Sequence, residues 1–215
     1  MGEYYNWVNV DKREYICPAD FDYGNKFHES MNKNSTPLHA LHTLLSDEWK
    51  GDHIVWFGDE TAVSAKSPYS AIRTLYDQSV DYGCPGDAFD LICESYRNVS
   101  CLFIEAEDRV REEIGYYLRE FQEKGRCEHY NEYGIDVEHP FNGLFQKTSK
   151  RFLYTINHTK KLFYSLDEWI YIDPLPTLMA YGHVKELGEW LGDIIGVSDQ
   201  QPKGYSMLNG LNNDW

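Results

Sequence analysis

The sequence lacks the motifs from which an activity is usually inferred. No Gly-x-x-x-x-Gly-Lys-Ser/Thr loop, no Gly-x-Gly-x-x-Gly before a helix and no Gly-x-Ser-x-Gly turn occurs in its 215 residues. The first two motifs hold phosphates with backbone N–H groups, and the third exposes a nucleophilic serine. Their absence counts against nucleotide-binding folds and against α/β-hydrolases.

Positive charge and long apolar runs are also scarce. The chain has 20 Lys and Arg against 35 Asp and Glu, a net charge of −15. A negative field repels phosphates, so we expect no direct binding to nucleic acid. No 18 apolar residues run together and no secretory signal opens the sequence, so we expect no membrane span and a cytoplasmic location.

The cysteines do not form a disulfide framework. They are odd in number and contain no Cys-x-x-Cys pair, a pattern typical of reduced thiols in cytosolic proteins. The five are Cys17, Cys84, Cys93, Cys101 and Cys127.

Aromatic residues are plentiful, and part of the sequence occurs twice. The chain has 17 Tyr, 10 Phe and 6 Trp, which favours a packed fold over disorder. Residues 48–59 read Glu-Trp-Lys-Gly-Asp-His-Ile-Val-Trp-Phe-Gly-Asp, and residues 189–199 read Glu-Trp-Leu-Gly-Asp-Ile-Ile-Gly-Val-Ser-Asp. Residues 154–164 match residues 6–16, most of the first hairpin segment, without a gap. Blocks repeated in the same order predict a duplicated module.

The periodicity predicts the elements of this module. Residues 4–16 resemble a β-hairpin, residues 38–47 an amphipathic helix and residues 53–57 a buried strand. Thr36 is expected to cap the helix, with Pro37 at its first position.

Helices are expected between the two copies. The predicted segments are residues 67–82, with Ser67 as cap, residues 87–96 and residues 100–124. The first should bury a face formed by Ile72, Leu75, Tyr76, Ser79 and Val80.

The sequence therefore predicts an α+β fold with two pseudo-symmetric ββαβ modules. Residues 1–60 form the first module, residues 61–150 a helical insert and linker, and residues 151–215 the second module and a tail. We expect them to pack as one compact domain.

Two motifs carry a resemblance to a known family. They are Tyr-x-x-Val-Asn-x-x-Lys-Arg-Glu-Tyr, from Tyr5 to Tyr15, and Trp-x-Gly-Asp-x-Ile-x-x-x-Gly-Asp, from Trp49 to Asp59. The chain resembles a family of bacterial proteins of uncharacterised function over residues 4–60 and 152–199. The resemblance implies the modular architecture and carries no activity, substrate or catalytic residue.

Four aspartates are the candidate metal ligands. Asp52, Asp59, Asp193 and Asp199 follow turns or strands, and facing modules could bring them together around Mg²⁺ or Mn²⁺. The alternative is that the Gly-Asp pairs are turn residues that bond to their own backbone.

The other polar candidates also have two interpretations. Trp49 and Trp190 could line a cleft between the modules, or they could be core. Lys12 and Lys160 could hold an anionic ligand, or they could be exposed turn residues. The pair His39 and His42 lacks cysteines at zinc-site spacing, so we expect polar residues on a partly exposed helix edge.

From these observations we expect a non-catalytic cytoplasmic recognition protein without a cofactor. It would bind another protein through an acidic, aromatic-rich surface. The alternatives are a metal-dependent hydrolase of a phosphorylated small molecule that uses the clustered aspartates, and a sensor that binds a small ligand at the module interface.

Overall fold

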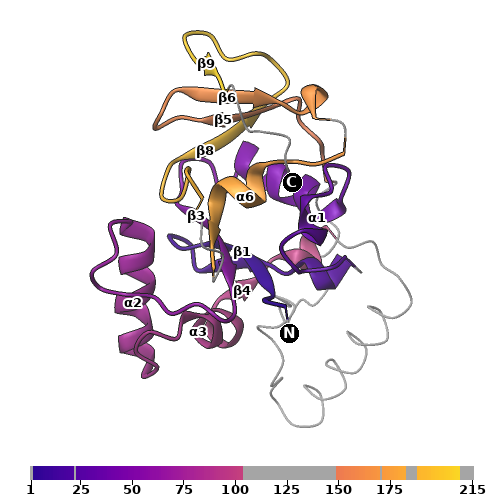
Figure 1. Ribbon diagram of the computed structural model, residues 1–215. Helices are drawn as coiled ribbons and strands as arrows, with labels where there is room; N and C mark the ends of the chain where they lie inside the picture. The colour runs from indigo at the N-terminus through magenta and orange to yellow at the C-terminus, as the bar shows by residue number, and fades with distance from the viewer. Residues whose placement is uncertain (1, 22, 104–148, 170, 183–187, 209–215) are drawn as a thin grey trace.

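The fold is α+β, as predicted. The computed structural model describes residues 2–21, 23–103, 149–169, 171–182 and 188–208 (Figure 1). The predicted helix over residues 100–124 lies mostly outside these ranges. Within them, no helix has the length and apolar character needed to cross a bilayer.

Five strands form the first sheet, in the order β4-β2-β1-β3-β7. β1 (Tyr5–Asn9) and β2 (Glu14–Ile16) form the predicted hairpin, and β3 (Ile54–Gly58) pairs antiparallel with β1. β4 (Arg97–Asn98) and β7 (Ala180–Tyr181) extend the two edges in parallel. β4 comes from the insert and β7 from the second module, so the first sheet combines all three predicted parts of the chain.

Four strands form the second sheet, in the order β8-β5-β6-β9. β5 (Tyr154–Asn157) pairs antiparallel with both β6 (Leu162–Ser165) and β8 (Ile195–Ser198). β9 (Ser206–Met207) pairs in parallel with β6 and was not predicted.

The second sheet repeats the edge pairing of the first. Arg97 of β4 donates its backbone N–H to the Arg13 carbonyl oxygen at 2.9 Å, and Ser206 of β9 donates to the Lys161 carbonyl oxygen at 2.9 Å. Arg13 and Lys161 are matched positions of the two hairpins. The repeated contacts therefore extend to a fourth strand beside each hairpin, whereas a rotational symmetry between the modules stays a prediction.

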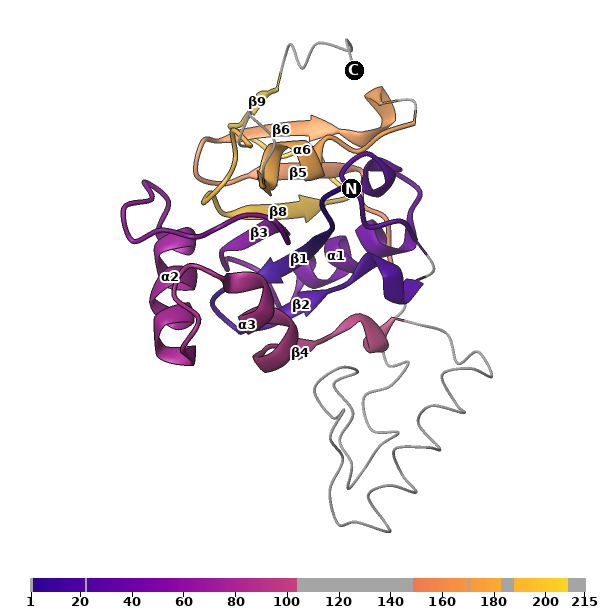
Figure 2. The same ribbon diagram turned by 60° about the horizontal axis from the view of Figure 1, so that its bottom comes forward.

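The two helices of the modules exchange partners. α1 (Thr36–Ser46) contacts β8 of the second module, and α6 (Leu175–Met179) contacts β3 of the first. Figure 2 shows β8 beside β3, where the two sheets meet. One hydrophobic core consequently contains residues from both modules, among them Trp7, Leu41, Trp49, Tyr164, Leu178 and Trp190.

The N-terminal cap of α1 lies one residue earlier than predicted. Ser35 has an extended backbone, and its Oγ accepts a hydrogen bond from the N–H of Leu38 at 3.4 Å. Thr36 is already helical and therefore cannot serve as the cap.

α2 (Ser70–Tyr82) and α3 (Ala88–Ser95) cover the opposite face of the first sheet. Successive strand residues point to opposite faces, so Val55 of β3 packs under these helices while Trp56 faces the shared core. This explains why every residue of β3 is buried. Short 3₁₀ helices make up the remaining elements: η1 (Pro18–Phe21), η2 (Glu29–Met31), η3 (Ser100–Leu102) and η4 (Leu166–Glu168).

Two details of α2 differ from the prediction. The helix begins at Ser70, and Ser67 instead accepts a hydrogen bond from the N–H of Tyr69 within the preceding turn. Val80 is 44% exposed rather than buried. The buried stripe runs through Leu75 and Ser79, and the next residue is rotated about 100° away from it.

We predict that residues 1–150 do not fold alone. Removing the second module strips the shared core of Tyr164, Leu178 and Trp190 and removes strand β7. The fragment should show no cooperative thermal transition in near-ultraviolet circular dichroism, whereas the full chain should. A cooperative transition in the fragment would show that the first module has a sufficient core of its own.

Candidate functional site

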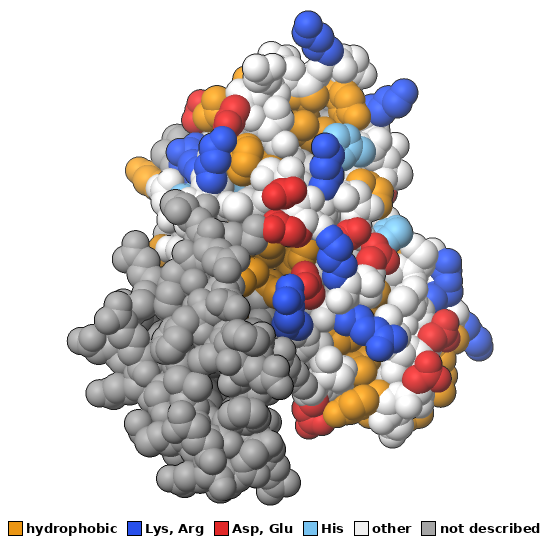
Figure 3. Space-filling model, turned by 180° about the vertical axis from the view of Figure 1, so that it is seen from behind, with side chains coloured by type: hydrophobic (Ala, Val, Ile, Leu, Met, Phe, Trp, Pro, Cys, Tyr) orange, Lys and Arg blue, Asp and Glu red, His pale blue; other side chains and the backbone are white. Residues whose placement is uncertain are grey.

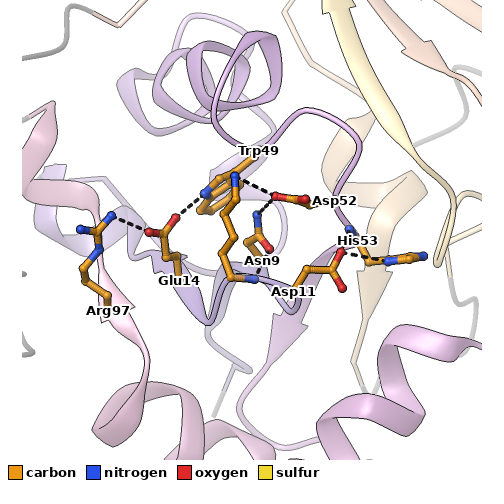
Figure 4. Close-up of polar contacts among 8 residues, drawn as sticks. Asn9, Asp11, Glu14, Trp49, Asp52, His53 and Arg97 are labelled. Atoms are coloured by element: carbon orange, nitrogen blue, oxygen red, sulfur yellow. Dashed lines mark hydrogen bonds and ion pairs between the residues drawn. The ribbon is translucent and has the colours of Figure 1, made fainter.

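The first Gly-Asp turn is bonded to the first hairpin (Figure 4). The Asn9 Oδ1 accepts a hydrogen bond from the backbone N–H of Lys12 at 2.9 Å, and its Nδ2 donates to the Asp52 Oδ2 at 2.8 Å. The Lys12 Nζ lies 3.2 Å from the same oxygen. Gly51 has a φ of +86°, which lets the chain turn between Trp49 and the aspartate.

The second Gly-Asp turn repeats these contacts. The Asn157 Oδ1 accepts from the N–H of Lys160 at 2.8 Å, and its Nδ2 donates to the Asp193 Oδ2 at 2.7 Å. The Lys160 Nζ lies 3.1 Å from that oxygen, and Gly192 has a φ of +82°. We call each Asn-Lys-Asp set a corner: Asn9, Lys12 and Asp52 form the first corner, and Asn157, Lys160 and Asp193 the second.

The two corners lie next to each other. His53 and Ile194, which follow the two aspartates, form an antiparallel bridge. Each also donates its backbone N–H to the hairpin turn of its own module: His53 to the Asp11 Oδ2 at 2.7 Å, and Ile194 to the Thr159 Oγ1 at 2.9 Å. The structure thus brings the two Gly-Asp turns to one place, and it ties each carboxylate to an amide and an ammonium group there.

The other two candidate aspartates lie elsewhere. Asp59 follows the far end of β3 from Asp52, about 20 Å along the strand at its usual rise per residue. Its Oδ1 accepts from the N–H of Tyr4 at 2.9 Å. Asp199 forms an ion pair with Lys150 at 2.5 Å. Among the described residues, no three His, Cys, Asp or Glu side chains are grouped so as to hold a metal ion.

The two candidate tryptophans are core residues. Trp49 and Trp190 have 0% and 1% of their surface exposed. The Trp49 Nε1 donates to the Glu14 Oε2 at 2.7 Å, while Trp190 packs against Tyr164 at 5.7 Å between ring centroids. Neither ring is open to a ligand in this structure.

A buried polar cluster joins the modules, and no sequence pattern predicts it. His42 of α1 is 1% exposed, which corrects the expected partly exposed position, and its Nε2 lies 3.4 Å from the Asp173 Oδ2. The Asp173 Oδ1 accepts from the Tyr164 hydroxyl at 2.5 Å and from the N–H of Leu175 at 2.9 Å. Burial and the neighbouring carboxylate raise the Tyr164 pKa well above its ordinary value. His39, the other histidine of α1, places its Nε2 3.3 Å from the Lys33 carbonyl oxygen.

Three of the described cysteines are poor nucleophiles. Burial, followed by the charge of nearby carboxylates, raises the pKa of Cys17 to about 12 and that of Cys93 to about 11. Burial likewise raises the pKa of Cys101 to about 12. A thiol with such a pKa stays protonated at neutral pH, whereas the reactive form is the thiolate.

Comparisons of the chain with protein-family models, with curated proteins and with solved structures give no match. The resemblance noted from the two sequence motifs therefore stays a prediction, and the function has to be argued from the chain itself.

The corners predict a stability difference between two kinds of substitution. Asn9→Ala and Asn157→Ala each remove a hydrogen bond to a carboxylate and the acceptor of a turn N–H, so each should cost about 2–3 kcal/mol. Lys12→Ala and Lys160→Ala are the controls: both side chains are about 40% exposed, and each change should cost less than about 1 kcal/mol. Urea unfolding measures both. Equal losses from the two kinds of substitution would contradict the role given to the asparagines.

The buried cluster predicts that substituting Asp173 costs more stability than substituting His42. Asp173→Ala should cost about 3–5 kcal/mol, because it leaves the Tyr164 hydroxyl and the Leu175 N–H without their acceptor. His42→Met should cost less than half as much, since the imidazole makes no hydrogen bond and Met179 stands at the matched position of the second module. Thermal and urea unfolding of the two variants test this order. A larger loss from His42→Met would reverse the assignment of Asp173 as the centre of the cluster.

Proposed function

We propose that the chain is a non-catalytic protein that recognises another protein. The proposal rests on the contacts made by the residues that are repeated in the two modules. In each corner the carboxylate is bonded to an asparagine and a lysine, and the adjacent tryptophan is buried. These contacts stabilise the fold, which supports a role of the repeated residues as a scaffold.

The outer surface supports binding rather than catalysis. The chain carries a net charge of −15, and Figure 3 shows Asp and Glu side chains interspersed with Lys, Arg and hydrophobic side chains on the face it displays. Aromatic side chains reach this outer surface, with Tyr171 79% exposed and Tyr82 and Tyr4 each 44% exposed. Exposed rings among charged groups are typical of protein interfaces, where rings supply contact area and charges steer association. The free thiols of the described cysteines fit a cytoplasmic location for this binding.

The metal-dependent hydrolase needs a different arrangement. It would use Asp52, Asp59, Asp193 and Asp199 together, yet Asp52 and Asp59 lie at opposite ends of one strand. Asp52 and Asp193 would also have to give up their lysine and asparagine contacts before they could bind a cation. This competition weakens a metal site there and favours the recognition protein.

The recognition function predicts a saturable protein complex. The full chain should capture a partner from native lysate, and the purified partner should then bind the purified chain at a fixed stoichiometry in calorimetry. Because the chain is acidic, the affinity should fall as ionic strength rises. Failure to reconstitute any complex, together with Mg²⁺- or Mn²⁺-dependent turnover of a phosphorylated substrate, would overturn the proposal in favour of the hydrolase.

A further inference from the structure

Two cysteines from distant parts of the sequence lie beside the same asparagine. Cys17 directly follows β2, and continuing the β1–β2 register by one residue places it opposite Asn6. Opposite residues of an antiparallel pair have their Cα atoms about 4.5–5.5 Å apart and point to the same face of the sheet. The Asn6 Nδ2 donates to the Cys93 Sγ of α3 at 4.0 Å. The hairpin and α3 therefore bring the two thiols to one place.

The tyrosine next to this place responds to both thiols. Tyr15 and Cys17 are two residues apart, so both point to the face of the first sheet that α2 and α3 cover, and both pack against the hydrophobic cluster there. Burial first, and then the charges of Cys93, Asp20 and Cys17, raise the pKa of the Tyr15 hydroxyl above its ordinary value. Both sulfur atoms thus lie within electrostatic range of one hydroxyl group.

The other described cysteines are engaged elsewhere. Cys17 and Cys93 are free thiols with partly exposed side chains, so a small oxidant can reach them. Cys101 is 5% exposed, and its Sγ donates to a backbone carbonyl oxygen at 3.7 Å. Cys84 donates to the Asp87 carbonyl oxygen at 3.0 Å, in the turn between α2 and α3. Among the described cysteines, Cys17 and Cys93 are the pair placed to react with each other.

We propose that Cys17 and Cys93 form a reversible disulfide when the chain meets a small disulfide such as oxidised glutathione. One cysteine thiolate attacks the glutathione disulfide, releases one glutathione and leaves a mixed disulfide. The other thiolate attacks the protein sulfur of that mixed disulfide and releases the second glutathione. The two cysteines lose two electrons and two protons in total, and two glutathione thiols form.

The surroundings of the two thiols favour a bond that forms slowly and is stable once formed. Burial is the main cause that raises the pKa of Cys17 to about 12 and that of Cys93 to about 11. Only a thiolate attacks a disulfide, so the exchange is slow at neutral pH. Thiol–disulfide pairs are strong oxidants when the protein stabilises the reduced form, and here the thiolates gain no such stabilisation. The pair therefore responds to lasting oxidation.

The disulfide ties the end of the first hairpin to α3 of the insert. It closes residues 17–93 into one loop, which contains α1, β3 and α2. Crosslinking a long loop reduces the conformational entropy of the unfolded chain and so stabilises the folded one. The hairpin and the insert already pack against each other in the reduced chain, so the bond adds to an existing contact. This inference does not depend on the proposed recognition function.

Oxidation of the folded full chain tests the pairing. After prolonged incubation with oxidised glutathione, peptide mapping without a reducing agent should join the Cys17 peptide to the Cys93 peptide, and dithiothreitol should separate them. Cys17→Ser should leave Cys93 without a crosslink, whereas the control Cys84→Ser should keep the crosslink. Joined peptides that contain Cys84, Cys101 or Cys127 instead would overturn the proposal. So would a folded chain whose cysteines stay reduced or stop at the mixed disulfide with glutathione.

Thermal unfolding tests whether the fold accommodates the bond. The oxidised chain should melt about 5 °C or more above the reduced chain, because the bond closes a long loop, and dithiothreitol should remove the difference. Cys93→Ser is the matched control, and the oxidant should leave its melting temperature unchanged. A lower melting temperature of the oxidised chain would show that the bond needs a rearranged fold, and would overturn the inference that the two thiols are neighbours.

Discussion

The fold depends on keeping two largely buried carboxylates bonded. The Asp52 side chain is 20% exposed and that of Asp193 is 12% exposed. A carboxylate so far from water needs donors, and the Asn9 and Asn157 amides supply them from the preceding hairpins. Each bond joins the turn after a helix to the preceding hairpin, and together with the antiparallel pairing it positions the closing strand against that hairpin.

The features that could be predicted are those with a local signal. The hairpins show aromatic and β-branched residues on both sides of a polar turn, and the Gly-Asp turns show a glycine that has a positive φ in the structure, as Gly51 does. The edge strands β4, β7 and β9 have two residues each, too few to show a period. The contact between His42 and Asp173 joins segments far apart in the sequence, so local sequence patterns do not predict it.

In the candidate site, too, only the features with a local sequence signal could be predicted. The repeat pointed to Asp52 and Asp193 correctly as a matched pair, because their spacing from Trp and Gly is the same in both copies. The repeat does not assign a role to these two aspartates, because a turn residue and a metal ligand can have the same sequence pattern. The contacts with Asn9 and Asn157 favour the role as turn residues, because they bond both carboxylates within the fold. Residues that are not repeated, such as the exposed Tyr82 of the insert, are therefore the candidates for a function beyond stability.

The exchange of helices between the modules also has a consequence for synthesis. β3 receives its neighbours α6 and β7 only after residues 175–181 have been made, and α1 receives β8 later still. At about 5–20 residues per second, the ribosome leaves the apolar side of α1 without its partner for on the order of ten seconds. During that time Leu41 and Leu44 are available to chaperones or to other nascent chains. A cell that makes this protein must therefore protect half of a core whose other half has not yet been translated.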